Sequence, residues 1–126
     1  MIGQLVIIAV LILGLDAAWL SYLLKSFNKM IVSIQGTSIK LRLVPTVIAY
    51  ILMIGSVWYF AVEPAKNYKD AALRGALLGL AVYGIYESTN YAILKNYSSS
   101  IALMDTLWGV FLFSVSAGVT KLLRPV

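Results

Sequence analysis

Four long apolar stretches alternate with short polar ones along the chain. A helix needs roughly 20 residues to cross the ~30 Å hydrocarbon core of a bilayer, and each stretch is close to that length. The second stretch has no charged residue, whereas each of the others has one or two. The pattern therefore predicts four transmembrane helices, at residues 2–24, 44–62, 77–94 and 101–123.

The polar stretches contain the residues that end and restart helices. Pro64 follows the second apolar stretch, where a helix should stop. Asn67, with Asp70 three residues later, is typical of a helix start. The short turn at Ser98–Ser100 makes the third and fourth helices antiparallel neighbours. We therefore expect an all-α integral membrane protein, an antiparallel four-helix transmembrane bundle that forms a single domain over residues 1–126.

The longest polar connection, residues 25–43, has a helical pattern of its own. Phe27, Met30 and Ile34 recur at helical spacing, and Gly36 is expected to end the helix. The pattern predicts a short interfacial amphipathic helix after the first span; the alternative is an irregular polar loop. The basic residues expected to contact lipid head groups here are Lys25, Lys29, Lys40 and Arg42.

Composition supports a membrane location. Hydrophobic residues make up 61% of the 126 residues and charged residues 12%, against ~45–50% and ~25% in soluble domains. Cysteine and histidine are both absent, which excludes zinc sites, thiol redox chemistry and His-based nucleophiles. We expect no metal and no cofactor. The net charge of +5 comes without a dense basic run, so we expect membrane lipids as partners and no nucleic acid.

Three acidic side chains interrupt the apolar stretches in the same half of the predicted bilayer. We name the side bearing loops 25–43 and 95–100 side B, and the side of the termini side A. At ~1.5 Å of rise per residue, Asp16 lies roughly 12 Å from the side B end of its helix. Glu87 lies roughly 10 Å deep and Asp105 roughly 6 Å deep. We therefore expect one shared layer of carboxyl groups. The ten basic residues divide five and five between the two sides, so orientation stays open.

Each of the two aspartates has a tryptophan three residues later on the same helical face, as in Asp16–Trp19 and Asp105–Trp108. Because the first and fourth helices run in opposite directions, each tryptophan is expected at the level of the other helix's aspartate. The third helix adds a polar face. The predicted intramembrane polar cluster comprises Asp16, Trp19, Tyr83, Tyr86, Glu87, Thr89, Asn90, Asp105 and Trp108.

Two features predict how the helices pack: small residues on helix faces and the free-energy cost of placing an acidic side chain in the membrane. Gly75 and Gly79 on the third helix and Gly109 on the fourth would allow close backbone approach. Glu87 costs ~2.5–3.5 kcal/mol near mid-helix, which cancels most of the gain from the apolar residues of its span, so the third helix needs its neighbours. The second span has almost no polar face. We expect it to be the most lipid-exposed helix or a contact to a second copy of the chain.

The polar cluster has two interpretations. One is structural: the carboxyl groups, protonated or paired with Lys95, bond to aromatic and amide donors and fix the register of the helices. Asp105 is the expected partner of Lys95. The other is a proton or cation relay, because intramembrane acids commonly mark such pathways. The sequence shows no catalytic constellation, so we expect no catalytic residues and no enzyme activity.

The same residues carry a family resemblance. The motifs are Leu15-Asp16-x-x-Trp19, Pro64-Ala65, Arg74-Gly75-Ala76-x-x-Gly79, Tyr83-x-x-Tyr86-Glu87-x-Thr89-Asn90-x-Ala92 and Asp105-x-x-Trp108-Gly109. In this order, over about residues 11–118, the chain resembles an uncharacterised family of small four-helix membrane proteins found in bacteria and large DNA viruses. Where this chain has Glu87 the family more often has Asp, and where it has Tyr97 the family often has Trp.

The resemblance implies architecture and no activity. The run at residues 90–97 and the absence of histidine and cysteine resemble the viral members more than the bacterial ones. This resemblance favours a structural or scaffold component of a virion or host membrane. Its expected protein partners are capsid or membrane proteins, or further copies of the chain. A proton- or cation-translocating channel or transporter is the alternative function.

Overall fold

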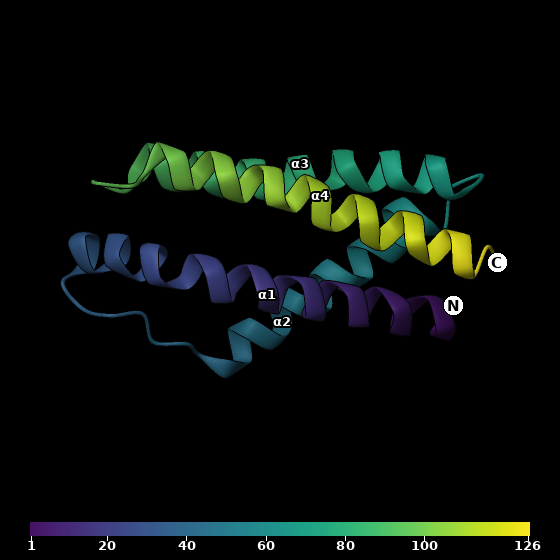
Figure 1. Cartoon of the computed structure of the whole chain (residues 1–126), viewed down its shortest axis with the longest axis horizontal. Coiled ribbons are helices and arrows are strands. Elements are labelled where there is room, and N and C mark those ends of the chain that lie inside the picture. Colours follow the sequence, from purple (N-terminus) through teal and green to yellow (C-terminus); the bar gives the residue numbers. More distant parts are fainter.

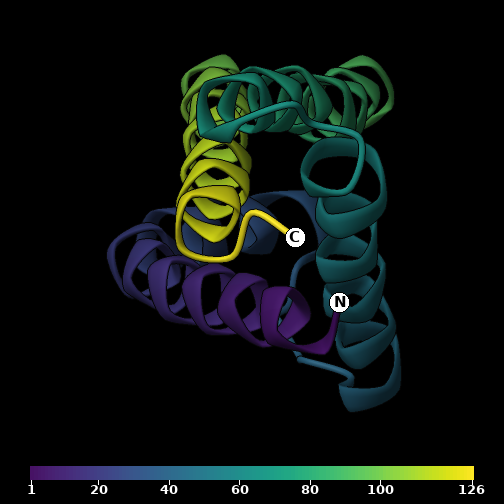
Figure 2. The same cartoon turned by 90° about the vertical axis from the view of Figure 1, so that its right-hand side faces the viewer.

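The computed structural model describes residues 1–126 and is entirely helical. The helices lie lengthwise beside one another, and both termini lie at the same end (Figure 1). Seen from that end, they surround a common centre (Figure 2). The elements are α1 (Ile2–Gln35), α2 (Leu43–Ser56), the π-helical segment η1 (Val57–Val62), α3 (Tyr68–Ile93) and α4 (Ser99–Leu123).

The helix stop predicted at Gly36 and the helix start predicted at Asn67 are confirmed by their caps. Gly36 ends α1 with a left-handed φ of 80°, a conformation in which glycine has no Cβ penalty. The Asn67 side chain accepts a hydrogen bond of 2.9 Å from the Asp70 backbone N–H at the start of α3. Ser98 caps α4 in the same way, accepting from the Ile101 N–H at 3.2 Å.

The separate interfacial helix predicted after the first span is wrong. Residues 25–35 are helical, but they continue α1 without a break, so α1 has 34 residues and is about 51 Å long. Met30 is buried with Tyr97 and Ile101 in a small apolar cluster at the α3–α4 turn. This contact with the α3–α4 turn takes the place of the expected lipid contact.

The closest contact in the bundle joins α3 and α4. A Cβ added at Gly75 would collide with the backbone carbonyl of Phe113, and one at Gly79 would collide with that of Gly109. A Cβ on Gly109 would in turn meet the ring of Tyr83. The contact pairs run in opposite order along the two helices. The three predicted packing glycines therefore lie where the two backbones approach most closely.

The second span divides into an exposed and a buried part. The helix α2 has no buried residue, whereas the following segment η1 buries Val57, Ala61 and Val62. The second span is the least buried of the three candidate membrane spans. The prediction that this span is the most lipid-exposed helix, or a contact to a second copy of the chain, stays a prediction, and its low burial agrees with either outcome.

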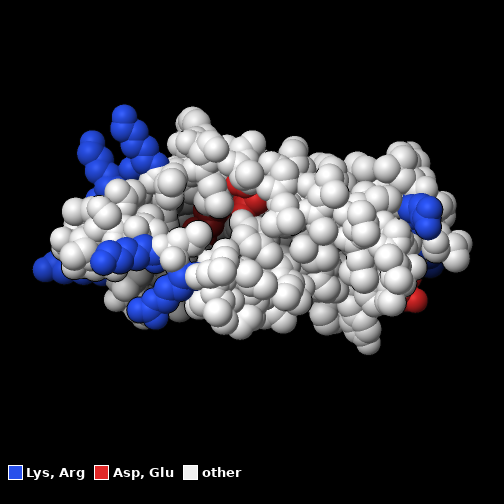
Figure 3. Space-filling view, turned by 90° about the horizontal axis from the view of Figure 1, so that it is seen from below, with Lys and Arg blue, Asp and Glu red and all other residues white.

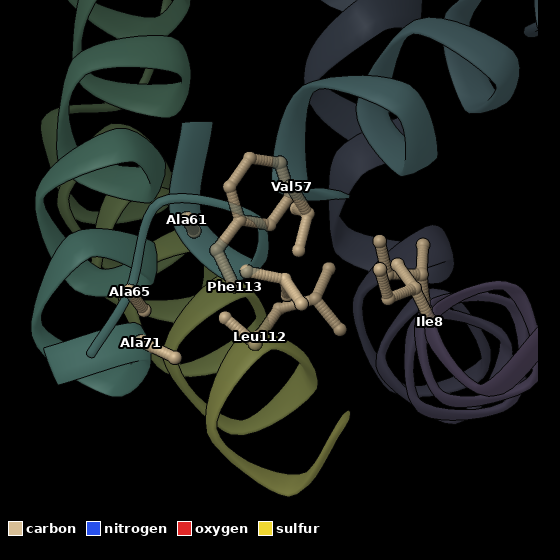
Figure 4. Packing of buried hydrophobic residues seen from close by; sticks show 10 residues of the cluster. Ile8, Val57, Ala61, Ala65, Ala71, Leu112 and Phe113 are labelled. Atoms are coloured by element: carbon tan, nitrogen blue, oxygen red, sulfur yellow. The ribbon is translucent and has the colours of Figure 1, made fainter. Parts of the chain in front are cut away.

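The apolar core is formed by residues of α1, η1, the start of α3 and α4, which pack together in Figure 4. Ile8, Ile12, Val57, Leu112 and Phe113 have no exposed surface. The ten buried residues of this cluster are isoleucine, leucine, valine, alanine and phenylalanine.

Three helical stretches are long and apolar enough to cross a membrane: α1, α2 with η1, and α4. The helix α3 has 26 residues, enough for about 39 Å, but its composition is more polar. This agrees with the expectation that the third helix depends on its neighbours.

Candidate functional site

Asp16 connects three elements through its carboxyl group. It is 7% exposed. The indole Nε1–H of Trp108 on α4 donates to Oδ1 at 3.1 Å, and the hydroxyl of Tyr50 on α2 donates to Oδ2. Each of the two carboxyl oxygens therefore accepts a hydrogen bond from a different helix, α4 for Oδ1 and α2 for Oδ2.

Asp105 makes the reciprocal contact, in which the aspartate is on α4 and the tryptophan is on α1. The indole Nε1–H of Trp19 on α1 donates to Asp105 Oδ1 at 3.2 Å. The rings of Trp19 and Trp108 stack, with centroids 4.9 Å apart and planes 7° from parallel. Each tryptophan thus lies at the level of the other helix's aspartate, as the rise per residue predicted.

Glu87 on α3 is the most deeply buried of the three acids, at 2% exposed. It accepts a hydrogen bond from the hydroxyl of Tyr97, in the turn before α4. The Asn90 side-chain amide donates to the same hydroxyl at 3.4 Å. Burial raises the pKa of Tyr97, and its hydrogen bond to Glu87 raises the pKa further, so the hydroxyl keeps its proton and remains a donor.

All three carboxyl groups line one cavity of about 210 Å³ between the helices. The space-filling view shows acidic atoms inside a hollow on the long side of the molecule, while Lys and Arg gather towards its two ends (Figure 3). No three acidic side chains are grouped closely enough to hold a metal ion. No basic residue lines the cavity. Its lining comprises Asp16, Trp19, Leu20, Leu23, Leu24, Phe27, Tyr50, Tyr83, Tyr86, Glu87 and Asp105.

Two details of the predicted cluster are wrong. Lys95 does not pair with Asp105: the protein's ion pair is Arg74–Asp70, at 3.2 Å on the surface. The Lys95 side chain is exposed, where its charge stays solvated and avoids the desolvation cost of a buried pair. Thr89 is exposed and makes no hydrogen bond with the cluster; it lies on the outer face of α3, two positions from Glu87.

The remaining predicted residues lie near the acids in different ways. Tyr83 packs edge-on against Phe113, with centroids 5.7 Å apart, and lines the cavity together with Tyr86, which is 54% exposed. The basic residues predicted to face lipid, two in the last part of α1 and two in the α1–α2 connection, are all exposed. They are Lys25, Lys29, Lys40 and Arg42.

Sequence reasoning missed two hydroxyl donors, Tyr50 and Tyr97. A signal for Tyr50 was present, since it lies six residues after Val44, roughly 9 Å from the side B end and close to the expected depth of Asp16. Tyr97 gave no such signal, because it belongs to a turn and is brought back over Glu87 by the left-handed backbone at Asn96, where φ is 66°.

The fold and the site define a small helical membrane protein with a hydrogen-bonded polar layer between its helices. The sequence pattern of a family described as "Predicted membrane protein (DUF2177)" matches residues 1–122, and the chain belongs to this family. The family description gives a membrane location and names no activity. No curated protein and no solved structure matches the chain.

Proposed function

We propose that the chain is a structural protein of a membrane, a non-enzymatic scaffold whose layer of acids and aromatic residues holds four helices in register. The observation that carries the proposal is the partner of each acid. Asp16, Glu87 and Asp105 all accept hydrogen bonds from tyrosine or tryptophan on another element. A buried carboxyl group without partners would be costly, and these partners fix how the helices lie relative to one another.

The proposal includes four antiparallel crossings of the bilayer, with α3 as the fourth. The helix is long enough to span, and its glycine face lies against α4, which covers part of its polar surface. Contacts between α1 and α4 also run in opposite order, from Gln4 with Arg124 to Trp19 with Asp105. Lipid would then meet the apolar outer faces.

The scaffold would connect lipid with protein partners. Its exposed basic end, at the α1–α2 connection, suits anionic head groups. The exposed apolar side chains of α2 suit lipid tails or another copy of the chain. A virion membrane with capsid partners is the setting that the family resemblance suggests, and co-purification from native membranes would identify the partner.

A proton or cation relay is the second candidate, favoured by the cavity that all three acids line. A relay needs a polar route through the whole membrane. The acid layer is separated from the termini end by the apolar core, in which Ile8, Ile12, Val57 and Leu112 have no exposed surface. This core supports the structural proposal over the relay.

Proton and potassium flux in proteoliposomes tests the choice. The structural proposal predicts leak rates equal to those of protein-free liposomes across a pH gradient, and no change in Glu87→Gln. Flux above that background that is lost in Glu87→Gln, but kept in the matched variant Glu63→Gln outside the acid layer, would establish the relay instead.

A further inference from the structure

A second, larger cavity lies between α2 and the α3–α4 pair. Its volume is about 530 Å³, within the range of roughly 300–1,000 Å³ that small-molecule sites have. Its wall on α2 consists of Ala49, Leu52, Met53 and Ser56, which recur at helical spacing and form one face of that helix. No residue of α2 is buried, so the other helices cover this face only in part.

The cavity opens sideways, between α2 and α3. The helix α2 diverges from α3 and α4 towards its own start in both views of the bundle (Figures 1 and 2). Leu52 on α2 and Val82 and Tyr86 on α3 line the cavity and are exposed. With α2 and α3 both crossing the bilayer, a molecule dissolved among the lipid tails can enter between them without passing the apolar core.

The polar part of the cavity is acidic. Asp105 is the charged residue in its lining, and it also lines the smaller cavity, which it shares with Glu87. These two carboxyl groups lie within hydrogen-bond reach of each other. No basic residue lines either cavity. Because charges away from water need a partner of opposite sign, a positively charged group is the partner that this pair of acids lacks.

Aromatic side chains adjoin the acid. Tyr83 and Tyr86 line both cavities, and Phe113 lines the larger one. The faces of such rings attract cations, and ammonium groups are bound in this way in other proteins. Apart from Ser56, the rest of the wall is apolar, which suits a hydrocarbon tail. The cavity therefore combines a site for a cationic head group with a site for a tail.

We propose that this cavity binds a lipophilic amine from the bilayer, with its ammonium group on Asp105 and its tail along the cavity face of α2. The acid selects the charge of the head group, and the apolar wall accepts the tail. The site rests on α2 and α3 both crossing the bilayer, which the accessibility of the connections tests separately. It goes beyond the structural role, because the helices keep their hydrogen bonds whether or not a ligand is present.

Binding of tritium-labelled decylamine to the purified full chain in phosphatidylcholine nanodiscs tests the proposal. Protein-free nanodiscs give the background from partition into lipid. Unlabelled decanol and decanoate have the same tail without the positive charge. At equal concentration in the membrane, each should displace the label at least about tenfold more weakly than unlabelled decylamine, since neither can form a hydrogen bond from a charged donor to Asp105.

Two substitutions test the two halves of the site. Asp105→Asn removes the charge and keeps an oxygen that can accept from the Trp19 indole, and the affinity for decylamine should fall about tenfold, the equivalent of ~1.4 kcal/mol. Leu52→Trp places a large ring in the cavity and should abolish displaceable binding. Ile51→Trp is its matched control, because Ile51 is 63% exposed like Leu52 but does not line the cavity; it should bind like the wild type.

Four results would each overturn the proposal. They are no binding above the protein-free background, displacement by decanol or decanoate as strong as that by decylamine, unchanged affinity in Asp105→Asn, and equal binding by Leu52→Trp and Ile51→Trp. Strong displacement by decanol would identify a cavity that takes any lipid tail. If Asp105→Asn does not fold, the competition series and the pair of tryptophan variants carry the test. Loss of the site in these assays would leave the hydrogen-bonded layer, and the structural role based on it, unchanged.

Discussion

At the scale of single residues, the protein solves one problem three times: how to keep a carboxyl group among apolar helices. An acidic side chain in the middle of a membrane helix costs ~2.5–3.5 kcal/mol on the insertion scale. Here the donors are aromatic N–H and O–H groups, which add hydrogen bonds without adding charge. A ring also fills the space beside the acid that it serves.

We expect Tyr97→Phe to lower the free energy of unfolding by about 0.6 kcal/mol and by no more than ~1.7 kcal/mol, the range for hydrogen bonds between membrane helices. The substitution keeps the ring and removes the hydroxyl that donates to Glu87. Reversible unfolding in mixed detergent micelles would measure the change.

Tyr91→Phe is the matched control, because Tyr91 is 55% exposed and makes no side-chain hydrogen bond. It should unfold like the wild type. Equal stability of Tyr97→Phe and Tyr91→Phe would show that the hydroxyl bond to Glu87 contributes nothing.

At the scale of elements, the α3–α4 pair is the part of the bundle in which backbone packing replaces hydrophobicity. The helix α3 is the least apolar of the four, and glycine lets it approach α4 closely enough for dispersion contacts and shared polar partners. Gly79 faces the backbone of Gly109, which cannot move aside as a side chain could.

Gly79→Ala should therefore push the two helices apart and destabilise the protein by about 1–3 kcal/mol, the usual cost of overpacking. Gly14→Ala and Gly55→Ala are the controls, since an added Cβ at either position meets nothing within 4 Å. They should be neutral or slightly stabilising, as alanine favours helix by up to ~1 kcal/mol over glycine. An equal effect at all three positions would contradict this account of the α3–α4 contact.

Element boundaries could be predicted because their signals are local. Gly36, Asn67 and Ser98 each act through a bond to a residue nearby in the chain. The path of α1 beyond Leu24 could not, because Met30 is buried by Tyr97 and Ile101, which are far away in sequence. A helix face that packs against protein has the same apolar pattern in the sequence as a helix face that lies on lipid.

At the scale of the whole molecule, charged and polar side chains are arranged along the long axis of the helix bundle. Basic residues lie at both ends, and the three acids of the acid layer line a hollow on the long side of the molecule (Figure 3). Depth could be predicted from rise per residue, which placed the acids and tryptophans correctly relative to one another. The hydrogen-bond donors to the acids could not all be predicted, because the position of Tyr97 depends on the backbone turn at Asn96.

Because the chain has no cysteine, single introduced cysteines can report which side of the membrane each connection faces. We expect Ser38→Cys and Ser100→Cys to react with a membrane-impermeant maleimide from one side, and Lys66→Cys from the other. Leu52→Cys, exposed on α2, should face lipid and stay unlabelled. Labelling of Lys66→Cys and Ser100→Cys from the same side would show that α3 does not cross.

The central claim is that the acid layer holds the helices together, and a double-mutant cycle between Asp16 and Trp108 tests it most directly. Asp16→Leu removes the acceptor and Trp108→Phe removes the donor of a bond that joins α1 to α4. We predict a coupling free energy of about 0.6–1.7 kcal/mol in the unfolding of the membrane-embedded protein. A control cycle between Asp16 and Trp58, which donates to Gln4 instead, should give no coupling. Additive effects of Asp16→Leu and Trp108→Phe would contradict the account.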